Sequence, residues 1–424
     1  MTAGSPQTIR WHIGVLLAAL VVAAATPALA GVFGSGYKQV GRCGPFARVA
    51  VRTPSWLCVG IVAGPDQGVI RPRVLLEVAP RRFVITDMFG WGDDGQRGRV
   101  LRLDVATDGK ATVTVLFAGL TTPHGLARGP DGLVYVAEPD RIWRFDPARD
   151  KPQRDLVLKD LPVDGDADLH PLKNLIFDAT GALIVSAGAP TDRCEAVHGN
   201  HASVQRPCAL TDTDPRPRAA LWRITFDKPG GRVASVQPLA RGLRNSMALA
   251  VHPRSGLLLQ GENSLDVFAR TPALDPPDEL NVVEAGRHYG WPYCTGNGLA
   301  TPEYAQDRID CRKFATPAAL LPPHASPLGI AYYAGAMFPE LSGKLIVGFH
   351  SLNPRPGNGH RIGIYDVDAN GVPAAKPPQW LLDDWSETPG LRPQGTPVGI
   401  AVAADGSIWF AEDVNQTIMV MLRP

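Results

Sequence analysis

The sequence predicts an all-β fold, a six-bladed β-propeller of four-stranded antiparallel blades. Three observations support this prediction. The 424 residues include 44 glycines and 40 prolines, a density typical of short strands joined by turns. A pattern of strand, Asp-Gly-type turn, strand, loop and strand recurs six times, as in propeller repeats. Beyond the first thirty residues, no long stretch of the chain shows helical periodicity.

The six copies follow one another without a linker-like change in composition. The expected strands cover residues 74–78, 83–86 and 100–105; 123–127, 133–137 and 141–145; 174–177, 183–187 and 221–226; 247–251 and 257–260; 328–333, 344–349 and 361–367; and 398–402, 407–411 and 417–422. An early strand within residues 57–63 would complete the last blade and close the ring. Two separate sheet domains are the alternative, and the missing linker counts against them.

The first thirty residues predict export. Residues 13–25 are apolar and follow Arg10, and Ala28-Leu29-Ala30 has the small-residue pattern of a signal-peptidase site. The apolar stretch is short for a membrane span, although an uncleaved anchor is the alternative. We therefore expect a signal peptide at 1–30, a single propeller at 31–424, a periplasmic or secreted location and no stable membrane span after cleavage.

The cysteine spacing and the net charge of the chain argue for disulfides and against two classes of partner, a covalent haem and a nucleic acid. Six cysteines form three local couples, Cys43 with Cys58, Cys194 with Cys208 and Cys294 with Cys311, which we expect to be disulfides in an exported chain. No Cys-x-x-Cys-His occurs, so a covalent c-type haem is not expected. The formal net charge of +1 argues against a nucleic-acid partner, which requires a clustered basic surface.

Strand parity predicts which residues share one rim of the propeller. In an antiparallel meander, the starts of first strands and the ends of second strands lie on the same side. Polar residues gather at these positions: His124, His170, Lys173, Arg244, Asn245, His324 and Thr396 before first strands, and Asp87, Gly261, Glu262, Asn263, His350 and Arg355 after second strands. We expect a pocket on this face, at the mouth of the central channel.

Several segments from about residue 70 onward resemble one enzyme family. They include His170-Pro-Leu-Lys173, Gly242-Leu-Arg-Asn245, Gln260-Gly-Glu-Asn263, Asp278-Glu-Leu-Asn281 with Tyr289-Gly-Trp-Pro292, and Pro323-His-Ala-Ser326. Their order resembles the soluble quinoprotein glucose/sorbosone dehydrogenases, which use pyrroloquinoline quinone (PQQ) and calcium. The resemblance implies a PQQ-dependent dehydrogenase of an aldose or sorbosone-type sugar, in which hydride passes to the quinone. Electrons then pass to an acceptor that the sequence does not name.

The resemblance also implies roles for individual residues. His170 looks like the general base, with His124 as the competing candidate, and imidazole chemistry suits a base near neutral pH. Arg244 matches a residue that contacts the quinone oxygens and stabilises developing charge. Lys173, Asn245, His324, His350 and Arg355 fall on segments that would contact the cofactor. Gly261 and Glu262 fall where the family offers carbonyl oxygens to calcium.

One position departs from the family pattern. The best-known relatives have two arginines just before the first strand of the last blade, whereas this chain has Gly395-Thr396-Pro397. Arg392, Arg355, Arg361 or Lys173 would have to provide the missing positive charge. Two other functions therefore stay open, a non-catalytic binding propeller and a metal-dependent propeller lactonase or lyase.

Overall fold

The computed structural model describes residues 36–164, 168–198, 201–266, 275–351, 359–385, 388 and 394–424. All of them belong to one compact unit, Phe33–Pro424. They form six four-stranded antiparallel blades arranged as a six-bladed β-propeller, as predicted. The predicted signal peptide lies outside the described residues.

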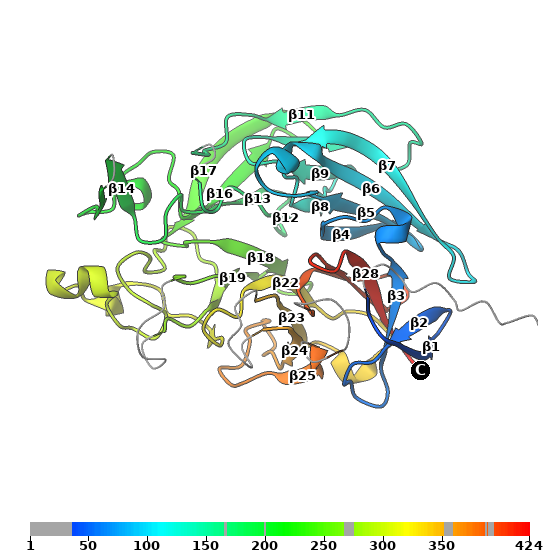
Figure 1. The fold of residues 1–424 in the computed structure, drawn as a ribbon. Coiled ribbons are helices and arrows are strands. Elements are labelled where there is room, and N and C mark those ends of the chain that lie inside the picture. Colours follow the sequence, from blue (N-terminus) through cyan, green and yellow to red (C-terminus); the bar gives the residue numbers. More distant parts are fainter. Residues whose placement is uncertain are drawn as a thin grey trace, which may run out of the picture. The chain divides into compact units, whose positions relative to one another are not determined.

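Each blade is a meander that runs outward from the central axis (Figure 1). Blade 1 consists of β4 (Pro72–Ala79), β5 (Arg82–Asp87), β6 (Gly98–Val105) and β7 (Ala111–Leu120). Blade 2 consists of β8 (Leu126–Arg128), β9 (Val134–Ala137), β10 (Ile142–Phe145) and β11 (Asp155–Leu158). Blade 3 consists of β12 (Leu175–Phe177), β13 (Leu183–Ala187), β16 (Ala220–Phe226) and β17 (Val233–Arg241).

The second half of the ring repeats this arrangement. Blade 4 consists of β18 (Ser246–Val251), β19 (Leu258–Glu262), β20 (Glu279–Val282) and β21 (Ala319–Leu320). Blade 5 consists of β22 (Pro327–Tyr332), β23 (Leu345–Phe349), β24 (Arg361–Tyr365) and β25 (Gln379–Leu382). Blade 6 consists of β26 (Pro397–Val402), β27 (Ile408–Glu412), β28 (Thr417–Leu422) and the early strand β3 (Cys58–Ala63).

The ring is closed by pairing the two ends of the propeller. Strand β3 pairs with β28, with Gly60 opposite Val420 and Cys58 opposite Leu422. This confirms the prediction that a strand within 57–63 completes the last blade, and Figure 1 shows the blue β3 beside the red β28. A hairpin of β1 (Gln39–Cys43) and β2 (Phe46–Val49) extends the same sheet outward. The Cys43–Cys58 disulfide joins this hairpin to β3.

Apolar side chains hold neighbouring blades together. Six buried clusters each combine residues of two adjacent blades, so every blade-to-blade interface has its own core. Between blades 6 and 1, for example, Trp409 packs against Phe83 with ring centroids 4.3 Å apart. Strands buried on both faces in this way are continuously apolar, which made the inner strands recognisable in the sequence.

Helical structure is short and lies between strands. The described helices are α1 (Ala209–Asp212), η1 (Pro65–Gln67), η2 (Gly92–Arg97), η5 (Pro302–Asp307), η6 (Cys311–Lys313) and η7 (Pro339–Leu341). A further hairpin, β14 (Glu195–His198) and β15 (His201–Val204), lies inside the loop between β13 and β16. Within the described part of the chain, no helix is long and apolar enough to cross a membrane.

Candidate active site at one rim of the propeller

A cavity of about 170 Å³ opens where strand parity predicts a pocket. We call it the rim cavity. It is lined by Arg73, Trp91, Leu169, His170, Pro171, Leu172, Asn245, Met247, Asn263, Ser326, Leu328 and His350. These residues come from blades 1, 3, 4 and 5. They lie just before inner strands, at the second position of inner strands, or after second strands. The predicted meeting of His170, Asn245, Asn263 and His350 at one face is therefore what the structure shows.

The inner end of the rim cavity is apolar. Leu172, Met247 and Leu328 line it and form a buried cluster with Val398. A second cavity of about 470 Å³ is lined by the inner strands, among them Leu328 itself and residues that follow Leu172, Met247 and Val398 in the sequence. The four apolar side chains therefore lie at the boundary between the rim cavity and the central channel.

His170 is held in the tautomer that a general base requires. Its Nδ1 lies 2.5 Å from the carbonyl oxygen of Ala189, so Nδ1 carries the proton. Nε2 is then the acceptor, and no residue that the structure describes donates a hydrogen bond to it. Its backbone N–H donates to Asp168 at 3.0 Å, and the Asp168 carboxylate is itself bound by Arg218. Burial, and next the positive charge of Arg244, lower the pKa of His170 well below 6.5. The imidazole is therefore neutral near pH 7.

Arg244 lies next to this cavity, with its guanidinium occupied by protein groups. Its Nε lies 2.8 Å from a carboxylate oxygen of Asp192, and Nη2 donates to Asp266 at 2.5 Å. Nη1 donates to the carbonyl oxygens of Asn263 and Ser264 at 3.1 and 2.6 Å. Asp266 is mostly exposed, so it is the partner that a ligand would most readily replace. The sequence predicted the position of Arg244 but gave no sign of these acidic partners.

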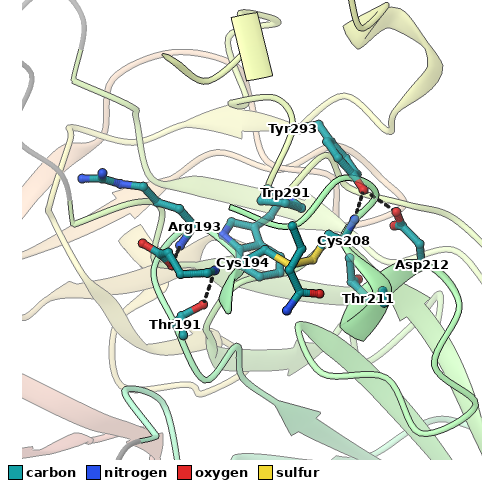
Figure 2. Close-up of a disulfide and its surroundings, with 12 residues drawn as sticks. Thr191, Arg193, Cys194, Cys208, Thr211, Asp212, Trp291 and Tyr293 are labelled. Carbon is teal, nitrogen blue, oxygen red and sulfur yellow. Dashed lines mark hydrogen bonds between the residues drawn. A yellow bond between two sulfur atoms is a disulfide. The ribbon is translucent and has the colours of Figure 1, made fainter. Parts of the chain in front are cut away.

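Trp291, which packs beside a disulfide, positions one of those partners, Asp192. Figure 2 shows the Cys194–Cys208 disulfide beside Trp291, with Tyr293 hydrogen-bonded to the backbone N–H of Cys208 at 2.7 Å. Trp291 donates from Nε1 to the carbonyl oxygen of Asp192 at 2.8 Å, which fixes the backbone from which the carboxylate reaches Arg244. All three predicted disulfides, including Cys294–Cys311, are present.

A charged cluster of residues from blades 1, 5 and 6 includes two side chains of the cavity wall, Arg73 and His350. Asp413, just after β27, binds Arg73 through one carboxylate oxygen and His350 through the other, the latter at 2.9 Å. Arg73 also donates from Nε to Nδ1 of His124 at 3.2 Å. Although burial alone would raise the pKa of Asp413, His350 and Arg73 hold it below the usual range. Asp413 therefore stays ionised and fixes both side chains at the cavity.

This cluster also settles where the competing base candidate lies. His124 is fully buried behind Arg73 and does not line the rim cavity. Burial, and next the charge of Arg73, lower its pKa well below 6.5. His124 therefore acts as a support for Arg73 in this arrangement.

Two other residues expected at the cofactor lie outside the rim cavity. Lys173 is buried and donates to the carbonyl oxygen of Pro171 at 3.0 Å, and burial, then Arg218, lower its pKa to about 7. His324 is buried with a left-handed backbone (φ 57°). Arg355 and Arg392 lie outside the described residues.

The residues expected to bind calcium are engaged within blade 4. Gly261 lies in β19 and pairs with Ala248 on one side and Leu280 on the other. The Glu262 carboxyl accepts from the backbone N–H of Asn245 at 2.9 Å and from Gln260 at 2.5 Å. Burial, and next the charge of Glu279, raise the pKa of Glu262 to about 8. Among the described residues, no three His, Cys, Asp or Glu side chains converge as a metal site.

Thr396, at the position where the sequence departs from the family pattern, supplies no positive charge to the site. Thr396 is buried and its hydroxyl binds the carboxyl of Glu412. Arg73 is the only arginine or lysine of the described chain that lines the rim cavity. It directly precedes the expected first strand of the first copy, so the parity rule that selected His170 would also have selected Arg73.

Comparisons with known proteins agree with the resemblance seen in the sequence. The family "Glucose / Sorbosone dehydrogenase" matches residues 224–353, a segment that contains Arg244, Asn245, Glu262 and His350. An uncharacterized protein of Borreliella burgdorferi is 32% identical over 183 residues, which are 42% of this chain and 47% of that relative. The match thus spans about half the length of this curated relative.

Solved structures share the fold. An enzyme of Carbohydrate-Active Enzymes Family AA12 from Trichoderma reesei has a TM-score of 0.69 at 18% identity, over 91% of this chain and 100% of that chain. The PQQ-bound aldose sugar dehydrogenase of Streptomyces coelicolor has a TM-score of 0.56 at 19% identity, over 88% and 99%. The apo soluble aldose sugar dehydrogenase of Escherichia coli has a TM-score of 0.55 at 15% identity, over 87% and 100%.

Proposed function

We propose that this chain is an exported, PQQ-dependent sugar dehydrogenase that oxidises a hydroxyl of an aldose or related sugar at the rim cavity. The observation that carries the proposal is a neutral His170, with Nε2 free, in a cavity that also holds Arg73, Asn245 and His350. The family match over residues 224–353 supports the reaction class. Three disulfides support export, because such bonds persist in oxidising compartments.

The rim cavity fits a flat, oxygen-rich cofactor. Leu172, Met247 and Leu328 offer an apolar surface to a planar ring. The guanidinium of Arg73 and the side chain of Asn245 would bind ring or carboxylate oxygens, and arginine suits carboxylate through its paired N–H groups. When bound, PQQ supplies a two-electron acceptor for hydride.

The protein's own contribution is to accept a proton and to order the site. Nε2 of His170 would receive the hydroxyl proton of the sugar while Nδ1–H donates to the Ala189 carbonyl oxygen, which stabilises the imidazolium. Arg244, Arg218 and Lys173 disfavour that charged form, so His170 would release the proton again after each turnover. Asp413 holds Arg73 and His350 in place throughout.

Whether PQQ binding requires calcium is left to the reconstitution experiment described below. The proposed ligands are the carbonyl oxygens of Gly261 and Glu262, yet Gly261 is paired within the β19 ladder and the Glu262 carboxyl is bound inside blade 4. These contacts do not fit a calcium site, so no step is assigned to the ion.

Reconstitution tests the proposal. The purified chain, stripped of cofactor, is titrated with PQQ with and without calcium, and the absorption spectrum is recorded at each addition. We expect saturable binding at one PQQ per chain and dye reduction that depends on both PQQ and an aldose. An absence of spectral binding, or dye reduction that does not depend on sugar, contradicts the proposal and favours the binding-propeller alternative.

A further inference from the structure

Two large apolar side chains are exposed at the rim cavity. Trp91 follows β5 in blade 1 and is 51% exposed, and Leu169 precedes β12 in blade 3 and is 57% exposed. Both line the rim cavity together with His170. A ligand that covers exposed apolar groups at a concave site removes their surface from water, so these two side chains favour binding of a ligand with an apolar face.

The loop that carries Trp91 is fixed at its base. The buried carboxylate of Asp87 accepts from the backbone N–H groups of Ile70, Arg71 and Phe89 at 3.0, 2.8 and 3.1 Å. It also binds Arg99 at 2.5 Å. Beyond it, the guanidinium of Arg97 lies over the Phe89 ring, 4.0 Å from the centroid. Trp91 is therefore presented by an ordered loop, and its exposure belongs to the folded state.

The same cavity offers an unused hydrogen-bond acceptor. The side-chain Oδ1 of Asn263 is buried and receives no hydrogen bond from any residue that the structure describes. Its backbone carbonyl is bound by Arg244, which holds the residue in place. A buried acceptor left without a donor costs free energy unless a ligand or water supplies one.

A ligand for this arrangement needs an apolar face and a hydroxyl edge. A pyranose ring has both, since its axial C–H groups form an apolar face and its hydroxyls surround the ring. Aromatic faces carry partial negative charge and attract such C–H groups.

We propose that Trp91, supported by Leu169, is the stacking surface for the pyranose ring of the substrate, and that Asn263 Oδ1 accepts a hydrogen bond from one ring hydroxyl. This inference rests on the proposed function, since it names the subsite from which a sugar presents its hydroxyl to His170. It defines the substrate class as pyranoses and assigns no chemical step to Trp91.

Substitution of Trp91 tests the subsite in two independent measurements. In the reconstituted enzyme, Trp91→Ala should raise KM for the aldose about 3- to 10-fold, the usual value of one aromatic contact, with kcat changed less than about twofold. Trp91→Phe should recover most of the loss, because an aromatic face remains. In the cofactor-free chain, calorimetric titration with the same sugar should show binding that Trp91→Ala and Asn263→Ala both weaken.

Leu156→Ala is the matched control, because Leu156 is similarly exposed (56%) on the outer strand β11 and should leave KM unchanged. An unchanged KM in Trp91→Ala overturns the inference. If the reconstituted chain oxidises no sugar but the cofactor-free chain binds sugar through Trp91, the subsite stands and the proposed function fails. If the cofactor-free chain binds no sugar and the reconstituted chain is inactive, both fail.

Discussion

At the scale of single residues, the protonation state of His170 decides whether the site can act as a base. Burial lowers its pKa, and the neighbouring Arg244, Arg218 and Lys173 lower it further. The hydrogen bond to Ala189 acts in the opposite direction, since it stabilises the protonated ring. A base with a low pKa is a weaker proton acceptor but remains deprotonated over a wider pH range.

This electrostatic arrangement predicts the pH dependence of the proposed reaction. The free enzyme must hold His170 neutral, so kcat/KM should fall as the pH drops through the folded pKa of His170, which lies below 6.5. Measurement of kcat/KM from pH 4.5 to 8 should therefore give an acid limb centred below 6.5. Lys173→Met removes one of the charges that lower this pKa, so it should move the limb to higher pH. A wild-type limb centred at or above 6.5 contradicts the account.

At the scale of the strand, glycine sets the distance between neighbouring inner strands. Gly125, Gly329 and Gly399 each occupy the third position of a Pro-x-Gly segment. A Cβ on Gly329 would lie 2.1 Å from the carbonyl oxygen of Val398, and one on Gly399 would lie 2.6 Å from that of Arg73. On Gly125 it would lie 2.8 Å from the carbonyl oxygen of Lys173. These glycines let the inner strands of neighbouring blades pack backbone against backbone, which brings the rim residues together.

Gly329→Ala tests this packing. The added methyl group meets backbone that cannot rotate away, so we expect a loss of stability at or beyond the upper end of the roughly 1–3 kcal/mol typical of overpacking. Thermal or urea unfolding of the purified chain measures the change. Ala331→Gly, in the same strand, is the control and should cost only about 0.5–1 kcal/mol. Equal stability of Gly329→Ala and wild type would show that the inner strands have room to separate.

At the scale of the whole molecule, the sequence predicted the ring and the face that carries the site. Inner strands are buried on both sides, so their apolar runs identified the six blades and the closing strand. Outer strands were not located, because the residues of β7, β11 and β17 are mostly half-buried or exposed, so these strands lack the continuous apolar runs of the inner strands. The expected second strand of blade 6 ended one residue early, which left Asp413 unnoticed. The partners of Arg244 come from distant loops, and no local pattern reveals them.

The six blades together form the site in which we propose that His170 accepts the sugar's proton in a PQQ-dependent oxidation. Single-turnover mixing of the PQQ-loaded chain with an aldose tests it most directly, with reduction of the bound cofactor followed by absorbance. His170→Ala should bind PQQ as wild type does and slow this step about 10²- to 10⁴-fold. His252→Ala, a buried histidine at the turn after β18, is the control and should react at the wild-type rate. A wild-type rate in His170→Ala, with PQQ fully bound, would contradict the account.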